Sequence, residues 1–428
     1  MTVPSRSLPL LVAASAAGAL TLSACAGSAG GAGGSGSGGG EGFAYGAPQE
    51  EVDAALADLE PVTLTYQPSA ASPTSVMADS AHAYKEMVEE RSGGKITIEL
   101  VWGQAIAGYT DVPDALADGR LDLSYALPIY MPGEFPSFDA AATSMSGLPI
   151  SPVVGEMVSS AVSAEIGWSA ENLLAEYEAE GVVPFSPVVA SGAYYSVCTQ
   201  PGTDAGFLQG KQVRVASTAH HEVANALGAS PVSMEYVEVF EALQRGTIDC
   251  TFAQLISSAE SGVLEVAPHV GYTSDADSMS SRAVGAELAG SSYQALPLAY
   301  QQILFDSAGV ARAAAGTTSV VNGTAMAIEQ AKGAGGGAVP FDEDVNATIA
   351  EANGALREKV VAEGLLGDDI GTRVDEAGAK WAARAEELGY TDGGTIEDVD
   401  EWWTPEDVDF TPWAEALYEE LYIPHRPA

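Results

Sequence analysis

The stretch Val112-Pro-Asp-Ala-Leu-Ala-Asp-Gly-Arg-Leu-Asp-Leu123 occurs a second time, in altered form, as Val239-Phe-Glu-Ala-Leu-Gln-Arg-Gly-Thr-Ile-Asp-Cys250. Each copy is typical of a helix end, a glycine stop and a short apolar strand. Gly119 and Gly246 stand where the chain leaves the helix, and glycine accepts the positive φ that this exit requires. Two copies of one helix–strand unit predict two similar α/β lobes, and a cleft between lobes is a usual place for a ligand.

The two copies also agree beyond the glycine. Leu121 and Ile248 are each expected to begin a strand, and Asp122 and Asp249 follow at the same place in each copy. The alternative is coincidence, because Ala-Leu-x-x-Gly is a common way to end a helix. The agreement over the whole stretch favours a duplicated unit.

The N-terminus has the pattern of an export signal. Arg6 supplies a positive charge, and residues 8–22 form an apolar run that is too short to cross a bilayer core of about 30 Å comfortably. The run ends in Leu22-Ser-Ala-Cys25, which resembles the lipobox of bacterial lipoproteins. This resemblance implies that the signal peptide, residues 1–24, is removed and that Cys25 carries a lipid anchor in the cell membrane. An ordinary secretory signal is the alternative.

The chain is strongly acidic, with 59 Asp and Glu against 17 Lys and Arg and a net charge of −42. Nucleic-acid binders need basic patches, so this charge argues against nucleic acid, and also against an anionic membrane surface, as a partner of the folded part. The sequence has no glycine-rich phosphate loop, paired-histidine zinc helix or nucleophile elbow. His220 and His221 are adjacent, and adjacent helix residues point about 100° apart, which is awkward for one metal ion. We therefore expect no cofactor and no metal.

Hydrophobic periodicity predicts alternating strands and helices, and hence crossover units with a mainly parallel sheet. In the first lobe the expected strands are 62–66, 95–101 and 121–127, and the expected helices are 75–91 and 111–118. In the second lobe the expected strands are 194–198, 212–215, 231–234 and 248–252, and the expected helices are 218–227 and 235–245. Helices dominate from Ser291 onward, with a glycine-rich loop at 333–340 and an aromatic tail packed onto the body.

One basic residue stands out on a short apolar strand. Arg214 lies between Val213 and Val215, and a guanidinium can bind a carboxylate through two parallel hydrogen bonds. Ser217 and Thr218 then open a helix, whose N-terminal amides also favour an anion. Strand end and helix start meet where ligands bind in open α/β sheets, so Arg214, Ser217 and Thr218 are candidate anion ligands. The alternative is a structural salt bridge to one of the many acids.

Cys198 and Cys250 both lie in predicted strands of the second lobe. The export signal directs them to an oxidising compartment, where disulfides persist. A bridge between them would close a loop of about 50 residues and contribute roughly 4 kcal/mol on the chain-entropy model. We expect this disulfide, with two free buried thiols as the alternative.

Three further stretches, 210–215, 226–234 and 238–249, resemble the signature region of substrate-binding proteins of TRAP (tripartite ATP-independent periplasmic) transporters. Residues 90–96 and 115–122, Phe135-Pro136 and residues 296–303 also match, so the resemblance covers most of 61–320. It implies a two-lobed periplasmic-binding-protein-like fold (type II-like) with a ligand cleft between the lobes, a long linking helix and a helical C-terminal region. It further implies a small organic acid as ligand, TRAP-type membrane permease subunits as partners, and Arg214 as the residue that pairs with the substrate carboxylate.

The sequence departs from the family pattern at two ligand positions. A ligand asparagine of many members is replaced by Ala253, and a second arginine falls near Tyr194-Tyr195, where no basic residue exists. Fewer polar groups and more aromatics suggest a monocarboxylate with an apolar body. Residues that could line its pocket, each of which could equally belong to the core, are Phe252, Gln254, Tyr236, Tyr125, Tyr130 and Trp102.

These observations predict a lipid-anchored, extracytoplasmic solute-binding protein that is not an enzyme. The expected organisation is a lipid-anchored tether at 25–60, which includes a run of almost only Gly, Ser and Ala, and then a binding lobe at 61–190. A second lobe at 191–275 follows, and 276–428 holds lobe-crossing strands, the long helix and the helical C-terminal region. A binding lipoprotein of an ATP-driven (ABC) importer and, less favoured, a surface hydrolase are the alternatives.

Overall fold

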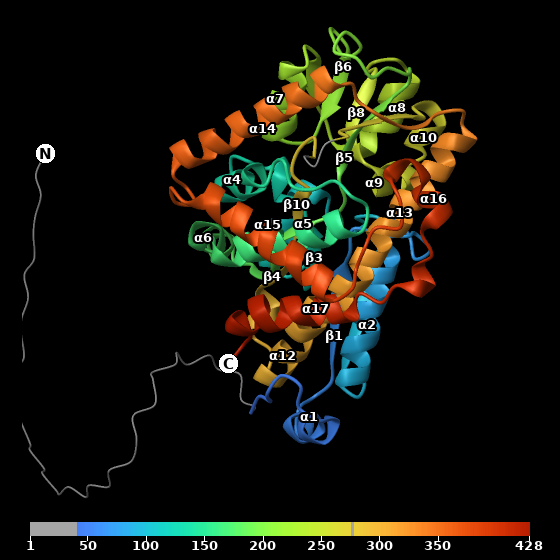
Figure 1. Ribbon diagram of the computed structural model, residues 1–428. Coiled ribbons are helices and arrows are strands. Elements are labelled where there is room, and N and C mark those ends of the chain that lie inside the picture. The colour runs from blue at the N-terminus through green and yellow to red at the C-terminus, as the bar shows by residue number, and fades with distance from the viewer. Residues whose placement is uncertain (1–40, 275–277) are drawn as a thin grey trace, which may run out of the picture. The chain divides into compact units, whose positions relative to one another are not determined.

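The computed structural model describes residues 41–274 and 278–428 (Figure 1). The expected signal peptide and Cys25 lie outside the described residues. Helix α1 (Gln49–Leu56) lies within the range that the sequence assigns to the tether, and its Val52 and Leu56 are buried in the core.

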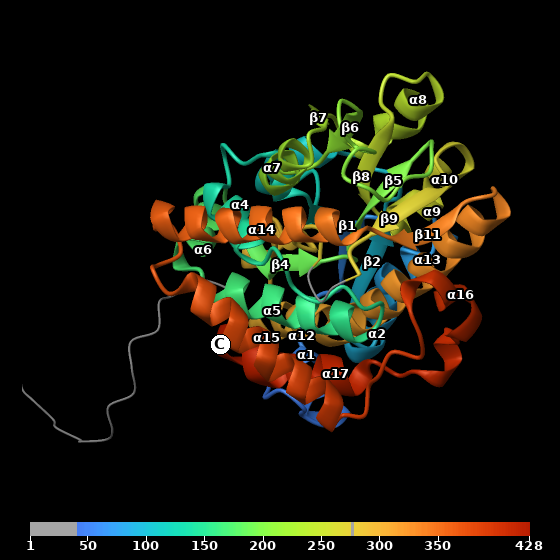
Figure 2. The ribbon, with the colours of Figure 1, turned by 45° about the horizontal axis from the view of Figure 1, so that its top comes forward.

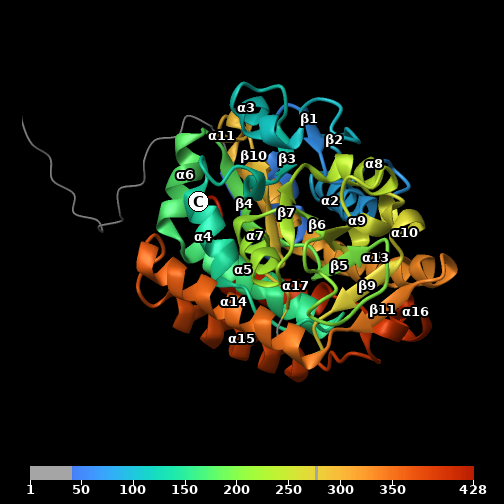
Figure 3. The ribbon, with the colours of Figure 1, turned by 90° about the horizontal axis from the view of Figure 1, so that it is seen from above.

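A five-stranded sheet holds the first copy of the repeated unit. Its strand order is β2-β1-β3-β10-β4. The strands are β1 (Val62–Gln67), β2 (Ile96–Leu100), β3 (Leu123–Ala126), β4 (Val183–Ala190) and β10 (Ala283–Ala289). A six-stranded sheet of order β11-β9-β5-β8-β6-β7 holds the second copy. Its strands are β5 (Tyr194–Cys198), β6 (Gln212–Val215), β7 (Ser230–Ser233), β8 (Cys250–Gln254), β9 (His269–Tyr272) and β11 (Gly337–Pro340). Figure 3 shows the strands from above.

Both sheets are mixed, which corrects the expectation of a mainly parallel sheet. The pairs β1–β2, β1–β3, β6–β7 and β6–β8 are parallel, as crossover units require. However, β10 is antiparallel to β3 and β4, and β5 is antiparallel to β8 and β9. Strands β4, β5, β9 and β10, which take part in these antiparallel pairs, lie on either side of two of the passages of the chain between the sheets, after β4 and after β9.

The repeated aspartates make equivalent hydrogen bonds in the two sheets. Asp122 Oδ2 accepts a hydrogen bond from the Thr65 amide at 2.7 Å, and Asp249 Oδ2 accepts one from the Gln212 amide at 2.8 Å. Gly119 and Gly246 have φ values of 78° and 68°, as the helix exits require. Strands β3 and β8 begin slightly later than expected, at Leu123 and Cys250, directly after these aspartates.

The expected disulfide between Cys198 and Cys250 is present. The two cysteines lie directly opposite each other in the antiparallel pair β5–β8, at the end of one strand and the start of the other. The bridge therefore fixes the register of the two strands that lead toward the centre of the molecule.

The helices before the long linking helix are α2 (Ala78–Arg91), α3 (Val112–Ala117), α4 (Pro136–Ser144), α5 (Val154–Ser169), α6 (Glu171–Ala179), α7 (Thr218–Ala226), α8 (Val239–Gln244), α9 (Leu255–Glu260), α10 (Val263–Val266) and α11 (Ser291–Gln294). The long linking helix comprises α12 (Leu298–Ser307), a π-helical turn (Ala308–Arg312) and α13 (Ala313–Gly333). Helix α13 packs against α2 beside the first sheet and against α9 beside the second (Figure 1).

The C-terminal region is helical, as expected, and contains α14 (Glu343–Glu363), α15 (Ile370–Glu387), α16 (Val399–Trp402) and α17 (Thr411–Leu417). Helices α14 and α15 meet at the turn that joins them and diverge from it (Figure 2). The aromatic tail packs onto the body, since Trp413, Tyr418 and Tyr422 are buried. Within the glycine-rich stretch expected to be a loop, Gly337–Pro340 forms β11, because it pairs with β9.

Candidate functional site

A cavity of about 240 Å³ is lined by residues that lie in, or shortly after, strands of both sheets. The first-sheet side contributes Tyr125, Leu127, Ile129 and Tyr130, and the second-sheet side contributes Tyr194, Arg214, Tyr236 and Gln254. Because both repeated units end at this place, the cavity has the location that the duplicated sequence predicts.

Arg214 is the cationic group of this cavity. It lies on β6 with only 1% of its surface exposed, between the buried Val213 and Val215. Its Nε donates to the Met234 carbonyl at 3.0 Å, its Nη1 to the Phe252 carbonyl at 3.4 Å, and its Nη2 to the Tyr130 hydroxyl at 3.2 Å. A guanidinium has five N–H donors. Two of them therefore make no hydrogen bond to the described residues.

The charge of Arg214 has no ion-pair partner among the described residues, unlike that of the other two buried arginines. Arg282 pairs with Glu156 at 2.6 Å, and Arg312 pairs with Glu287 at 3.2 Å. No ion pair of Arg214 with a carboxylate is formed within residues 41–274 and 278–428. Because a buried unpaired charge is costly, this site is suited to an anion that arrives from outside.

Aromatic side chains form much of the rest of the wall. The Tyr236 ring lies 5.2 Å from the Arg214 guanidinium carbon, and the Tyr109 and Tyr130 rings make an edge contact at 6.4 Å. Burial raises the pKa of Tyr109, Tyr194 and Tyr236 above the ordinary value of a phenol. These hydroxyls therefore stay protonated at neutral pH and can donate hydrogen bonds to a ligand.

Several other polar groups are held by hydrogen bonds within the wall. Gln254 Nε2 donates to the Ser191 hydroxyl at 3.0 Å, and the Tyr236 hydroxyl shares a hydrogen bond of 3.0 Å with Ser258. The Tyr125 ring lies against Gly285 so closely that a Cβ there would come within 2.3 Å of it. The cavity wall is thus preorganised on the side of the crossing strand β10.

The structure brings five of the sequence candidates to the cavity and leaves four outside it. Those that line the cavity are Arg214, Tyr125, Tyr130, Tyr236 and Gln254. The other four, Ser217, Thr218, Phe252 and Trp102, do not line the cavity, which corrects their expected placement. The Phe252 ring is fully buried beside His220, and only its carbonyl serves the site by holding Arg214. Trp102 lies against His82 at the edge of the first-sheet core.

Ser217 and Thr218 open helix α7 as expected but do not line the cavity of Arg214. The Ser217 hydroxyl accepts from the His220 amide at 3.1 Å, which is an N-cap. Burial raises the pKa of the Asp139 carboxyl, and a hydrogen bond from Thr218 partly offsets this effect. The N-terminus of α7 is therefore occupied by structural contacts, because it faces α4 rather than the cavity.

Sequence reasoning missed several lining residues that lie far from Arg214 in the chain. The cavity also includes Ser69, Met77, Gln104, Tyr109, Ser191, Tyr194, Ser257 and Glu260. A signal existed for Tyr194, which stands where a second arginine of the resembled family was expected. No sequence signal marked Tyr109 or Glu260, because only the packing of the two sheets brings them together.

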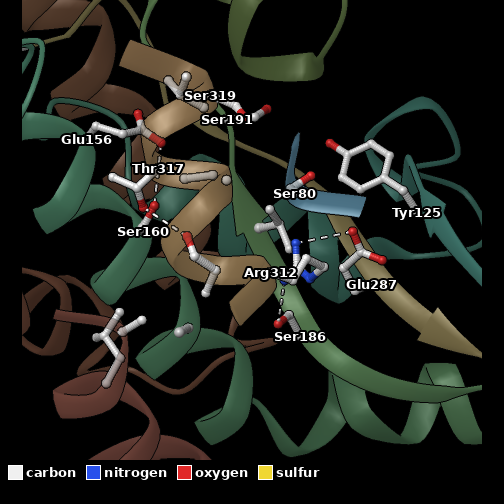
Figure 4. A pocket seen from close by; sticks show the side chains of 18 of the residues that line it. Ser80, Tyr125, Glu156, Ser160, Ser186, Ser191, Glu287, Arg312, Thr317 and Ser319 are labelled. Atoms are coloured by element: carbon white, nitrogen blue, oxygen red, sulfur yellow. Dashed lines mark hydrogen bonds and ion pairs between the residues drawn. The ribbon is translucent and has the colours of Figure 1, made fainter. Parts of the chain in front are cut away.

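A second, smaller cavity of about 110 Å³ adjoins the first and shares Ser69, Met77, Tyr125 and Ser191 with it (Figure 4). Its arginine is neutralised, because Arg312 pairs with Glu287 and donates to Ser186 at 3.3 Å. This cavity therefore lacks the free cation that distinguishes the first.

Residues 41–274 and 278–428 contain no group of three His, Cys, Asp or Glu side chains placed to hold a metal ion. No helix in the same residues is long and apolar enough to span a membrane. His220 is fully buried, and both of its ring nitrogens lack a hydrogen-bond partner in the described structure.

The fold and the cavity together define a solute-binding protein of the periplasmic binding class, with a buried cationic site between two sheets. Residues 68–363 match the family model of bacterial extracellular solute-binding proteins, family 7. The chain belongs to this TRAP solute-binding family, whose members bind small organic acids and work with TRAP permeases. It is therefore not an enzyme, and the family assignment decides against an ABC-importer lipoprotein and a hydrolase.

Solved structures with low sequence identity share the fold. A TRAP solute-binding protein from Rhodoferax ferrireducens T118 with copurified benzoate has a TM-score of 0.64 at 19% identity, covering 77% of this chain and 100% of that one. A marine metagenome protein specific for aromatic acids, from an unidentified microbe and bound to 3-hydroxybenzoate, has a TM-score of 0.63 at 18% identity, with 76% and 99% covered. A sugar-acid-binding protein from Advenella mimigardefordensis bound to galactonate has a TM-score of 0.63 at 18% identity, with 76% and 100% covered.

Proposed function

We propose that this protein captures a small organic monocarboxylate with an apolar body and delivers it to a TRAP-type permease, with Arg214 as the anchor of the carboxylate. The observation that carries the proposal is the contrast among the buried arginines. Arg282 and Arg312 each have a carboxylate partner, whereas Arg214 has none among the described residues and lines the cavity. An incoming carboxylate would supply the missing partner.

The apolar body follows from the size and composition of the wall. A cavity of roughly 150 Å³ lined by apolar groups can hold a benzene molecule. The cavity here, at about 240 Å³, is larger and is lined by tyrosines together with Leu127, Ile129, Phe240 and Val284. A ring or branched chain of similar size would fill this space. The benzoate and 3-hydroxybenzoate complexes of proteins with this fold are consistent with such a ligand.

Ala253 supports a ligand with one carboxylate. It lines the cavity at the position where many relatives of the resembled pattern have an asparagine. A methyl group cannot hydrogen-bond a second polar group of the ligand, so the position of Ala253 offers the ligand no polar contact. Tyr130, which accepts from Arg214, would keep the guanidinium plane aligned for two parallel bonds to the carboxylate.

The proposal includes the organisation predicted from the sequence. Residues 61–190 and 191–275 would form the two lobes, which close over the ligand, and the long helix in 276–428 would link them. Cys25 would carry the lipid anchor and hold the protein outside the cell membrane. Mass spectrometry of the purified membrane form would show a diacylglyceryl modification on Cys25 if this part is right.

A thermal-shift screen tests the function. Purified protein is screened against monocarboxylates, dicarboxylates, sugar acids, amino acids and sugars, with Arg214→Ala in parallel. We expect a monocarboxylate to raise the melting temperature of the wild type, and the variant to lose roughly 2 kcal/mol or more of binding free energy, since the ligand anion would then be desolvated without a partner.

Arg120→Ala is the matched control, because Arg120 pairs with Asp118 on the exposed surface. It should bind the same ligand as tightly as the wild type. A monocarboxylate that stabilises the wild type and Arg214→Ala equally would refute the role of Arg214.

A further inference from the structure

Glu260 is the second charged residue that lines the cavity of Arg214 within the described parts of the chain. It is the last residue of α9, the helix that directly follows strand β8. Sequence reasoning gave no role to it. An acid is unexpected in a cavity suited to an anion, and its contacts show how it is held there.

One oxygen of Glu260 is fixed across the cavity by the first-sheet side. Its Oε1 accepts hydrogen bonds from the Ser75 hydroxyl and from the Met77 amide, the latter at 3.3 Å. Met77 is the N-cap residue of α2, and the N-terminus of a helix favours a negative charge. The carboxyl group is therefore held in place by two donors from the first-sheet side.

The other oxygen has no such contact. Glu260 Oε2 makes no hydrogen bond, and Glu260 forms no ion pair, with any residue in 41–274 or 278–428. The carboxylates of the adjoining cavity are different. Glu287 is bound by Arg312 (Figure 4) and by Tyr66. Glu156 is bound by Arg282. Glu260 thus keeps an acceptor available in the cavity of Arg214, whereas the acids of the adjoining cavity are engaged in ion pairs.

We propose that Glu260 determines ligand specificity: it accepts a hydrogen bond from a hydroxyl or ammonium group of the ligand and excludes a second carboxylate. This inference rests on the proposed function, because Arg214 must fix the ligand's carboxylate first. A hydrogen bond to an ionised oxygen is stronger than one between neutral groups. A second ligand carboxylate would face the like charge of Glu260 in a partly desolvated site, which is unfavourable.

Two matched ligand series test the inference by titration calorimetry on the purified protein. The aromatic series is benzoate, 3-hydroxybenzoate, 3-(aminomethyl)benzoate and isophthalate. The aliphatic series is butanoate, 4-hydroxybutanoate, 4-aminobutanoate and succinate. Within the series that binds, we expect the hydroxyl or the ammonium acid to bind roughly tenfold tighter than the plain acid, and the diacid to bind at least tenfold weaker. The hydroxyl and ammonium members distinguish the two donor groups.

Glu260→Gln is the decisive variant. The amide oxygen can still accept from Ser75 and Met77, so the fold and the contact across the cavity are kept, but the charge is lost. We expect the preference for the donor-bearing acid to shrink severalfold and the diacid to gain affinity, while the plain acid binds as before. Ser75→Ala, which removes a contact but keeps the carboxylate, should retain the wild-type ranking of ligands.

Unchanged ratios between the plain acid, the donor-bearing acid and the diacid in Glu260→Gln would overturn the inference. Arg214→Ala separates this failure from failure of the proposed function. If the plain acid binds and loses affinity in Arg214→Ala while Glu260→Gln changes no ratio, only the role of Glu260 is wrong. If no monocarboxylate binds, either in these series or in the thermal-shift screen, both the monocarboxylate function and the inference drawn from it are wrong.

Discussion

At Arg214 a strand with two buried valines places a full positive charge in the interior. The backbone carbonyls of Met234 and Phe252 and the hydroxyl of Tyr130 solvate the guanidinium but do not neutralise it. Neutral acceptors of this kind reduce the cost of burial and hold the side chain in one orientation. The guanidinium is therefore already ordered, and under the proposed function this would lower the cost of ordering when a carboxylate binds.

His220 lies next to this site. Because its pKa is lowered in the folded protein, we expect the stability to depend on pH. Burial first, and the charge of Arg214 second, lower its pKa from 6.5 to about 3. The Tyr194 ring packs on it at 4.0 Å and Phe252 lies beyond. The unfolded chain takes up a proton near pH 6.5 and the folded chain does not, so this contribution to stability is complete above that pH and is lost as the pH falls toward 3.

The expected size of this effect is about 2 kcal/mol of unfolding free energy lost between pH 7.5 and pH 5.0. Urea denaturation at both pH values measures it. His220→Phe, which fits an aromatic surrounding and cannot titrate, should show a loss smaller by that amount. His221→Ala, a change at the exposed neighbour, should behave as the wild type; an equal pH dependence in all three proteins would contradict the assignment to His220.

At the scale of elements, the repeated helix–strand unit fixes the register between two neighbouring parallel strands in each sheet. In each sheet an aspartate after the glycine exit binds the amide of the neighbouring parallel strand, so helix, turn and two strands are fixed together. Asp122 also accepts from the Ser292 hydroxyl at 2.6 Å, which ties the crossing strand β10 and the start of α11 to the same carboxylate.

Asp122→Ala should therefore lower the free energy of unfolding by roughly 2–3 kcal/mol, because it removes two hydrogen bonds to a charged acceptor. Urea denaturation monitored by circular dichroism provides the measurement. Asp122→Asn keeps one carbonyl acceptor and should lose less than half as much. Equal losses in the two variants would show that the hydrogen bond to Thr65 does not stabilise the unit.

The elements that the sequence predicted well are those with a local signal. Strand β5 and strand β6 have the predicted bounds, and Ala81, Tyr84 and Val88 form the buried face of α2. Strand β4 was missed because Pro184 and Pro187 argue against a strand. Strand β11 was missed because its glycines look like a loop until β9 offers a partner.

The residues of the site can also be separated into those with a local sequence signal and those without one. Arg214 was predictable because a lone cation between valines is a local anomaly and falls on the signature of a known family. Tyr109 and Glu260 were not predictable, because their place in the cavity depends on contacts between segments far apart in the chain. Phe252 and Trp102 were wrongly placed in the pocket, since an aromatic residue in a strand or loop serves the core equally well.

At the scale of the whole folded part, the two sheets are joined by the segments after β4 and β9 and by the long helix. A buried ion pair between Arg312, at the end of the π-helical turn, and Glu287, on β10, fixes that helix to the crossing strand. Burial raises the pKa of the Glu287 carboxyl, and Arg312 partly offsets this effect. The buried charges of these linking elements are thus paired, whereas the buried charge of Arg214, which lines the cavity, has no ion-pair partner among the described residues.

The most direct test of this account is the affinity, by titration calorimetry, of the tightest acid from the screen and of its uncharged primary amide, each measured with wild type and with Arg214→Met. The wild type should prefer the acid over the amide, and the variant should lose that preference, with a coupling of about 2 kcal/mol or more between carboxylate and guanidinium. An amide that binds the wild type as tightly as the acid, or a preference that survives in Arg214→Met, would contradict the claim that Arg214 awaits a carboxylate.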